Sequence, residues 1–417
     1  MTMPVPAPAA LGPATDGAPR LEDWNGRLPE DVEYLADMHG WARLLGTRMP
    51  MFERPMVSWV FRYALVERLM NHPKMRPVGM DIMALRGITE GPLFEWWDRI
   101  VLMAHGERHT RLRAPLQRTF AFPVIAQRRE RVRGLIDQRL DELTGAGEID
   151  FIEEIAAQIP TRAICDLLGV PQADIPVFKA WADTLGQAFG MLTAEDVGPV
   201  DDAVTNLTAY VQGLVADRRA NPREDFLTAF IQSVGESGAY SEDELLAQIL
   251  GLIFAGSDTT RTALTVAMTL LLQHQDQWTR LIAERGLMRQ AVDETLRFEP
   301  TVGSLPRFAT EDIEIDGITL PGDQVIVLAI SAAQRDPERY DAPNRFDITR
   351  ADLPRMAIGF GGGPHRCLGE MLARIEIEET LDAIATRFPQ VDFAGPLPHF
   401  VALATGIRKL EGLRVRI

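Results

Sequence analysis

The residues best suited to chemistry lie late in the chain, in the segment FGGGPHRCLG at 360–369. Cys367 directly precedes a predicted helix, and the N–H groups and dipole at a helix start stabilise a thiolate. The glycines before it allow the backbone to approach a large, flat group. A lone cysteine beside a glycine turn is more often just a buried thiol, but the full spacing argues against that interpretation. A hydrolase with Cys367 as nucleophile and His365 as base is disfavoured, because residues two apart at a loop–helix junction do not readily form such a pair.

A second group of polar residues interrupts an apolar helix predicted over 241–273, which Ser241 and Glu244 would begin as a capping box. Asp258 and Thr259 lie midway along it, in AGSDTT, where polar side chains are costly unless they are satisfied. Glycines within a helix each cost about 1 kcal/mol relative to alanine, and there are two here, at 251 and 256. Both features are explained if the helix bulges over a ligand.

Two further motifs place charged residues at helical spacing. Glu294 and Arg297 are three residues apart, so they can pair on one helix face. His109 and Arg113 are four apart and also share a face, and arginine suits a carboxylate through paired hydrogen bonds. Pro115 conflicts with the carbonyl four residues earlier, so we expect a kink or an early helix end there.

The elements that must position these residues are predicted to be mostly helical. Apolar periodicity predicts helix over 57–71, 105–145, 276–298 and 368–388, and several helices between 150 and 240. Alternating β-branched residues and turn signals predict β structure over 311–330 and short strands over 397–417. We find no repeat and no linker after about residue 20. We therefore expect a loose tail over 1–20 and a single domain over 21–417.

Composition excludes several classes of function. The net charge of −16 gives no general attraction to nucleic acid or anionic lipid. No apolar run approaches the ~18 residues of a membrane span, and the N-terminus does not resemble a signal peptide. We therefore expect a cytoplasmic protein that binds neither membrane nor nucleic acid. The two cysteines, Cys165 and Cys367, exclude a disulfide framework and a four-cysteine cluster. Cys165 is expected to be a buried free thiol.

In their order along the chain, these motifs resemble those of the cytochrome P450 family. The pattern F-x-x-G-x-[HR]-x-C-x-G resembles the family's heme signature, in which the cysteine thiolate binds the iron. E-x-x-R, the acid–alcohol pair on the long helix and an arginine after the E-x-x-R helix match as well. The resemblance implies a mainly α fold with a minor β region. This single-domain fold is a triangular helical prism, whose long central helix crosses a heme b cofactor.

The resemblance also assigns roles to individual residues. Phe360, Leu368 and Gly369 would surround the heme, with the last two donating backbone N–H groups to the sulfur of Cys367. The heme propionates would be bound by His109, Arg113, Arg307 and His365. Thr259 would hydrogen-bond the bound dioxygen, and Asp258 would supply protons. A structural cluster of Glu294, Arg297 and Arg345 would hold the heme loop. The substrate pocket would contain Phe254, Ala255, Val302, Gly303 and Ser304, capped by residues 80–97.

The implied activity is a monooxygenase that inserts one oxygen atom from O2 into a largely apolar substrate, most simply by hydroxylation. The chain has no flavin or iron–sulfur segment, so the electrons would come from a separate ferredoxin and its NAD(P)H-driven reductase. Residues 107–133 hold eight arginines against two glutamates, a basic patch that could steer such a partner unless it is only a solvated helix. The expected state is a monomer. Two alternatives are a peroxide-using relative and a non-catalytic heme sensor; neither would need the Asp258–Thr259 pair.

Overall fold

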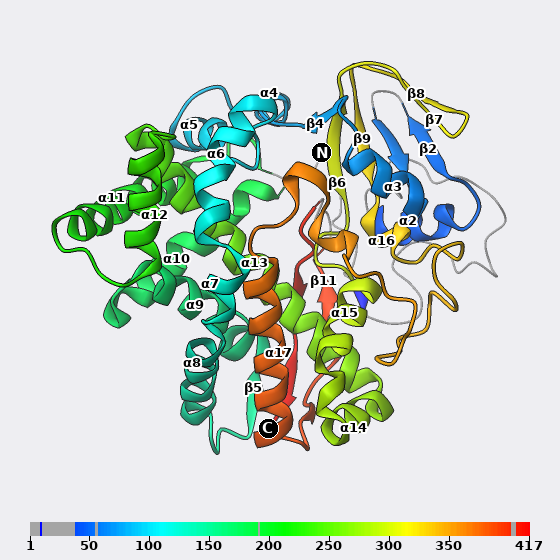
Figure 1. The fold of residues 1–417 in the computed structure, drawn as a ribbon. Helices are drawn as coiled ribbons and strands as arrows, with labels where there is room; N and C mark the ends of the chain where they lie inside the picture. Colours follow the sequence, from blue (N-terminus) through cyan, green and yellow to red (C-terminus); the bar gives the residue numbers. More distant parts are fainter. Residues whose placement is uncertain (1–8, 11–37, 55–56, 191, 402–405) are drawn as a thin grey trace.

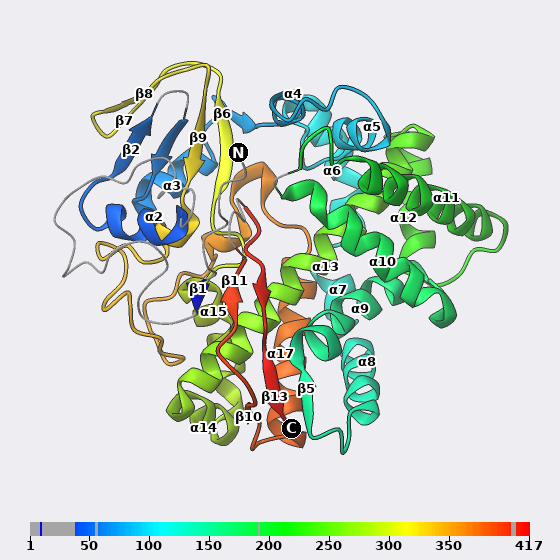
Figure 2. The same ribbon diagram turned by 180° about the vertical axis from the view of Figure 1, so that it is seen from behind.

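The computed structural model describes residues 9–10, 38–54, 57–190, 192–401 and 406–417. It is mostly helical with a small β region, as predicted (Figures 1 and 2). The helices of the first half are α2 (Met38–Gly46), α3 (Tyr63–Met70), α4 (Asp81–Leu85), α5 (Pro92–Arg99), α6 (Gly106–Thr119), α7 (Phe122–Ala126), α8 (Arg129–Glu142), α9 (Gln158–Leu168), α10 (Ile175–Leu185), α11 (Gly198–Ala220) and α12 (Phe226–Ser237). The later helices are α13 (Glu242–Gln273), α14 (Gln275–Ala283), α15 (Met288–Phe298), α16 (Ile330–Ala333) and α17 (Glu370–Arg387).

Short strands from distant parts of the chain form the β region. One sheet has the order β2 (Met51–Arg54), β3 (Val57–Val60), β9 (Gln324–Leu328), β6 (Leu305–Ala309) and β4 (Met75–Pro77). Within it β3 and β9 are parallel and the other pairs antiparallel. Smaller sheets join β10 (Asp392–Phe393), β13 (Arg414–Arg416) and β5 (Glu148–Asp150), and β1 (Ala9–Ala10), β11 (His399–Phe400) and β12 (Leu410–Glu411). A hairpin is formed by β7 (Ile313–Ile315) and β8 (Ile318–Leu320).

The central helix α13 is the element around which the others pack. Ser241 and Glu244 form the predicted capping box at its start. Its 32 residues correspond to about 48 Å, and most of its second half is buried. It contacts α9, α10, α11, α15 and α17, and both ribbon views place it in the middle of the molecule.

The predicted bulge in α13 is absent, because the helix is regular from end to end. The presence of glycine at position 256 is explained by packing instead, because a Cβ atom there would lie 2.4 Å from Cδ1 of Ile164 on α9. The glycine therefore allows α9 and α13 to pack closely.

Three further sequence predictions need correction or limitation. Residues 57–60 are strand β3, not helix, because they pair with β9 more than 260 residues later. Of the two outcomes expected at Pro115, a kink or an early helix end, the early end is wrong, because α6 passes the proline and ends only at Thr119. The proline is buried, and α6 packs on α12. Of the predicted tail, only Ala9–Ala10 is described, as strand β1 against β11. No described helix is long and apolar enough to cross a membrane.

Candidate active site

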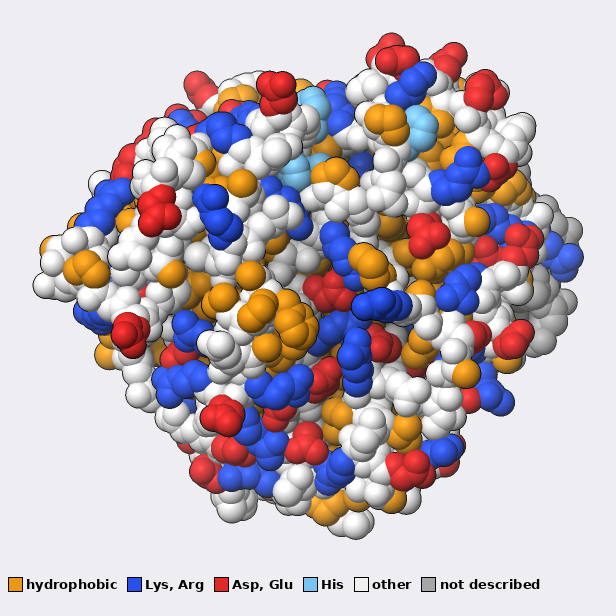
Figure 3. Space-filling model, viewed as in Figure 1, with side chains coloured by type: hydrophobic (Ala, Val, Ile, Leu, Met, Phe, Trp, Pro, Cys, Tyr) orange, Lys and Arg blue, Asp and Glu red, His pale blue; other side chains and the backbone are white. Residues whose placement is uncertain are grey.

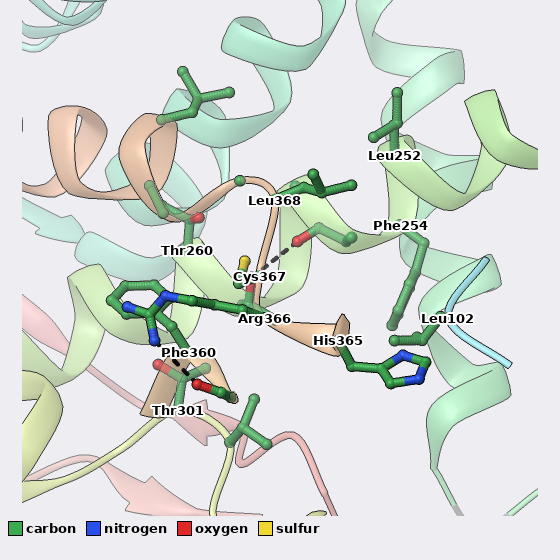
Figure 4. Close-up of a pocket in the computed structure, with 18 of the residues that line it drawn as sticks. Leu102, Leu252, Phe254, Thr260, Thr301, Phe360, His365, Arg366, Cys367 and Leu368 are labelled. Atoms are coloured by element: carbon green, nitrogen blue, oxygen red, sulfur yellow. Dashed lines mark hydrogen bonds between the residues drawn. The ribbon is translucent and has the colours of Figure 1, made fainter. Parts of the chain in front are cut away.

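A cavity of about 330 Å³ lies between α13, α17, the 358–369 loop and the chain leading into β6. Its volume is within the range of small-molecule sites. Aliphatic and aromatic side chains form most of its wall, and a few polar groups converge on it (Figure 4). Of the predicted site residues, it is lined by Arg113, Phe254, Ala255, Thr259, Val302, Arg307, Phe360, His365, Cys367, Leu368 and Gly369.

The loop before α17 has a backbone that only glycine accepts easily. Gly361 and Gly363 have φ angles of +75° and +58°, in the left-handed region. A Cβ at Gly363 would also lie 2.6 Å from Oδ1 of Asn71. The N–H of Cys367 donates to the carbonyl of Phe360 at 2.8 Å. These constraints fix the cysteine at the cavity wall.

Cys367 exposes its surface to the cavity that it lines, while protein surrounds the rest of the residue. Burial is the largest influence on its thiol and raises the pKa, whereas a hydrogen bond from the Gly369 N–H and the charges of Arg113 and Arg366 favour the thiolate. A coordinated metal cation deprotonates such a thiol outright. The donor is therefore suited to a metal with soft ligand preference.

Two of the arginines that line the same cavity, Arg113 and Arg307, have no acidic partner among the described residues. Within this part of the chain they donate to the backbone carbonyls of Arg366 and Pro306. Nε of Arg113 and Nε2 of His109 are buried without a hydrogen-bond partner there. Burial lowers the pKa of Arg307 to about 10, which is the effect expected where no carboxylate compensates the charge.

The two histidines lie together, with ring centroids 4.1 Å apart. Burial lowers the pKa of His109 to about 4 and that of His365 to about 3, and neighbouring cations add to both shifts. His109 does not line the cavity itself, but its ring packs against that of His365, which does. The group as a whole fits a ligand with negatively charged oxygens, and with Cys367 and the glycine loop it fits heme.

The comparison with known proteins agrees with this geometry. The family model described as "Cytochrome P450" matches residues 161–391, more than half of the chain. The chain belongs to the cytochrome P450 family. The plant-inducible cytochrome P450-pinF1 of Rhizobium radiobacter is 34% identical over 83% of this chain and 82% of its own. The vitamin D(3) 25-hydroxylase of Pseudonocardia autotrophica is 34% identical over 70% of this chain and 71% of its own.

Solved structures support the same assignment. The crystal structure of CalO2 matches with a TM-score of 0.85 at 28% identity, over 93% of this chain and 97% of that one. Sequence relatives that are 30–34% identical to this chain are named monooxygenases and hydroxylases. The chain is a cytochrome P450 monooxygenase with the P450 fold, and the family implies a heme-iron cofactor.

The structural cluster of this P450 differs from the prediction in one member. Glu294 and Arg297 pair as predicted, at 2.6 Å, and both are buried. The second arginine is Arg350, whose Nε lies 3.2 Å from Oε1 of Glu294. Arg345 instead points to Asp347 with 70% of its side chain exposed. It contributes its backbone carbonyl to Arg297, at 3.2 Å.

Asp258 and Thr259 face different surroundings although they are neighbours in sequence. Thr259 lines the cavity and donates its hydroxyl to the carbonyl of Ala255 at 2.9 Å. Asp258 is 2% exposed and is not among the cavity-lining residues. Its carboxylate pairs with Arg261 at 2.5 Å and with Lys409 at 3.0 Å.

Of the residues predicted for the substrate pocket, Phe254, Ala255 and Val302 line the cavity. Gly303 and Ser304 do not line it. Gly303 instead gives room to His39, because a Cβ at this glycine would lie 2.3 Å from Cε1 of that ring.

The predicted cap, residues 80–97, contributes core packing: Met83, Trp96 and Trp97 are buried and do not line the cavity. The segment that does line the cavity, residues 100–102, is not among the predicted site residues. Its apolar run Ile-Val-Leu after a helix was the available signal.

Proposed function

We propose that this P450 inserts one oxygen atom from O2 into a largely apolar small molecule, with hydroxylation as the expected outcome. The proposal assigns heme b as the cofactor and a separate ferredoxin as the electron source. The observation that carries it is that Cys367, on its glycine loop, shares one cavity with Thr259 on the central helix. Apolar side chains from residues 100–102, Phe254 and Val302 complete that cavity and favour an apolar substrate.

Heme ligated by a thiolate supplies the chemistry of O2 activation when it is bound. In the proposal the chain's own residues do the remaining work. Cys367 provides the thiolate, and the Gly369 N–H donates to it. Arg113, Arg307 and the paired histidines bind the carboxylates of the cofactor. The apolar wall excludes water from the reacting carbon.

Proton supply is proposed for the pair on α13. The Thr259 hydroxyl donates to Ala255 within its own helix, and a rotation about χ1 would redirect it to the cavity that it already lines. Asp258 lies one residue earlier with its carboxylate on the Lys409 and Arg261 side. Proton transfer from Asp258 therefore requires either a change of its rotamer or an intervening water.

The proposed ferredoxin site is the face that carries α6, α7 and α17, at the front in Figure 1. On this face exposed hydrophobic side chains gather near the middle among basic ones (Figure 3). Phe122 and Val124 on α7 are 66% and 44% exposed. The local excess of arginine supports the site less than the sequence suggested. Of the eight arginines in residues 107–133, six form ion pairs with acidic side chains of the same chain, namely Arg108, Arg111, Arg128, Arg129, Arg131 and Arg133.

The carbon monoxide difference spectrum of the reduced, purified protein tests the proposal. A strongly red-shifted Soret band that is lost in Cys367→Ser would support thiolate ligation. A band typical of neutral or histidine ligation would contradict the role of Cys367. Product formed from O2 with ferredoxin and reductase, but not from peroxide alone, would separate the monooxygenase from its peroxide-using alternative. The cytoplasmic location and the monomeric state stay predictions.

A further inference from the structure

One side chain, Gln248 on α13, connects the central helix to the irregular segment at residues 99–102. Its Oε1 accepts the N–H of Val101 at 2.8 Å, and its Nε2 donates to the carbonyl of Arg99 at 2.7 Å. Gln248 is 2% exposed and lines the cavity. Both ends of one buried amide are thus used on a single short stretch of backbone.

The Ile100 side chain anchors that stretch in the core, but few other hydrogen bonds among the described residues hold its backbone. Arg99 is the last residue of α5, and the carbonyls at the end of a helix have no partner within it. The turn that follows is closed by long hydrogen bonds, from Met103 to Ile100 at 3.2 Å and from Ala104 to Val101 at 3.3 Å. Gln248 therefore satisfies the carbonyl of Arg99 at the end of α5 and the N–H of Val101 just beyond it.

The neighbouring residue of α13 makes a parallel contact to α5. Nε1 of Trp96 donates to the carbonyl of Ala247 at 3.1 Å, and Trp96 is itself buried. The indole fixes the body of α5 relative to the central helix. Gln248 makes a similar connection just beyond the end of α5, to the residues that line the cavity.

The held segment forms one wall of the cavity. Ile100, Val101 and Leu102 all line it. Ile100 packs one helical turn beyond Gln248, where a Cβ at Gly251 would lie 3.7 Å from its Cγ2. Leu102 lies beside Phe254 on the side of the cavity that also carries His365 (Figure 4).

We propose that Gln248 is a specificity-determining positioning residue, which holds the Ile100–Leu102 wall at a fixed distance from α13 and so sets the width of the substrate pocket. This inference rests on the proposed function, because it assigns the cavity to a substrate. An amide is suited to the task because it offers an acceptor and two donors without a charge.

The test replaces Gln248 by Met, which keeps the length of the side chain and removes both hydrogen bonds. The holoenzyme is titrated with imidazole and with 4-phenylimidazole, whose phenyl ring must fit against the wall. We expect the dissociation constant of 4-phenylimidazole to rise about tenfold, as for the loss of two hydrogen bonds, and that of imidazole to stay within about twofold. Amide exchange over residues 100–104 should become about tenfold faster by the same reasoning.

A matched control and a second variant complete the experiment. Gln117→Met makes the same change on the exposed face of α6 and should alter neither readout. Leu102→Ala, at a side chain that is 44% exposed, should weaken 4-phenylimidazole binding without faster exchange, and it keeps the proposal testable if the Gln248 variant does not fold.

Two results would overturn the proposal. Unchanged exchange in Gln248→Met would mean that the amide does not hold the wall. Faster exchange with equal changes for both imidazoles would mean that Gln248 only caps α5. If the parent protein did not bind heme at all, that result would contradict the proposed function instead. The exchange measurement would still decide whether Gln248 holds residues 100–102 in place.

Discussion

Lys409 holds the carboxylate of Asp258 from the C-terminal end of the chain, with Nζ 3.0 Å from Oδ2. Arg261 binds the other oxygen at 2.5 Å from the next turn of α13. The carboxylate also lies against Gly186, where a Cβ would be 2.5 Å from Oδ2. The acid expected to supply protons is therefore a buried member of an ion-pair network, and its effect on turnover must be separated from its effect on that network.

Asp258→Asn should lower kcat about a hundredfold, the usual size of a general acid–base contribution. The variant keeps the shape of the side chain and removes the titratable group. Lys409→Met removes only the partner and should change kcat by a few-fold at most. Steady-state kinetics with ferredoxin and reductase check both. Equal losses in the two variants would mean that the ion pair matters and the carboxylate does not donate protons.

Thr259→Ala should uncouple electron use from product formation, because the hydroxyl that lines the cavity is lost. The measurement is the ratio of product to NAD(P)H consumed, together with the peroxide released. Thr259→Ser retains the hydroxyl and should keep most of the coupling. If the alanine variant couples as well as the parent, the proposed role of Thr259 in proton delivery is wrong.

Arg350→Ala should destabilise the protein by about 1.5–3 kcal/mol, because the buried carboxylate of Glu294 loses one charged hydrogen-bond partner and keeps Arg297. Arg345→Ala is the matched control. Its side chain is 70% exposed, so the loss should stay within about 0.5 kcal/mol. Urea unfolding of both variants measures the difference. A larger loss for Arg345 would restore the cluster inferred from the sequence.

The outcome for these two arginines illustrates what the sequence could predict. Glu294 and Arg297 are related by helical spacing, a local rule, and they pair as expected. The capping box at Ser241 and Glu244 is equally local and is also confirmed. The second arginine lies in an irregular segment, where no periodicity decides which side chain turns inward. The structure assigns that position to Arg350.

Contacts between distant segments were beyond the reach of sequence patterns. Gly303 is small because His39 packs against it, and the two are separated by most of the chain. Strand β3 was predicted as helix because its apolar residues suit either structure, and pairing with β9 decides the matter. The hydrogen bonds of Gln248 are likewise nonlocal, since they join residues nearly 150 positions apart.

Phe122→Asp should raise the apparent KM for ferredoxin several-fold with an unchanged carbon monoxide spectrum. The side chain is 66% exposed, so a charge there disturbs docking and not the core. Val177→Asp on α10 is the control, at a side chain that is 43% exposed on another part of the molecule. Arg128→Glu with Arg129→Glu would break ion pairs to Asp166, Glu378 and Glu379 and is therefore a less specific test. Unchanged ferredoxin kinetics in Phe122→Asp would exclude α7 from the docking site.

Glu376 on α17 should make the stability of the protein depend on pH. It is 1% exposed and lines the cavity, and its Oε2 has no hydrogen-bond partner among the described residues. Burial raises its pKa to about 8, so the folded protein holds a proton at neutral pH that the unfolded chain releases. Its contribution to stability is therefore complete below the unfolded pKa of 4.5 and is lost as the pH rises to about 8.

The contribution of Glu376 to the pH dependence of stability can be measured by comparing the parent with a variant that cannot ionise. Between pH 5 and pH 8 the free energy of unfolding should fall by up to about 1.4 kcal/mol per pH unit more in the parent than in Glu376→Gln. The variant keeps the volume of the side chain and cannot ionise. Glu130→Gln, at an exposed position on α8, should leave the profile of the parent unchanged. Parallel profiles for the parent and Glu376→Gln would show that Glu376 is ionised in the folded protein, and an unseen partner would then have to stabilise its charge beside the cavity.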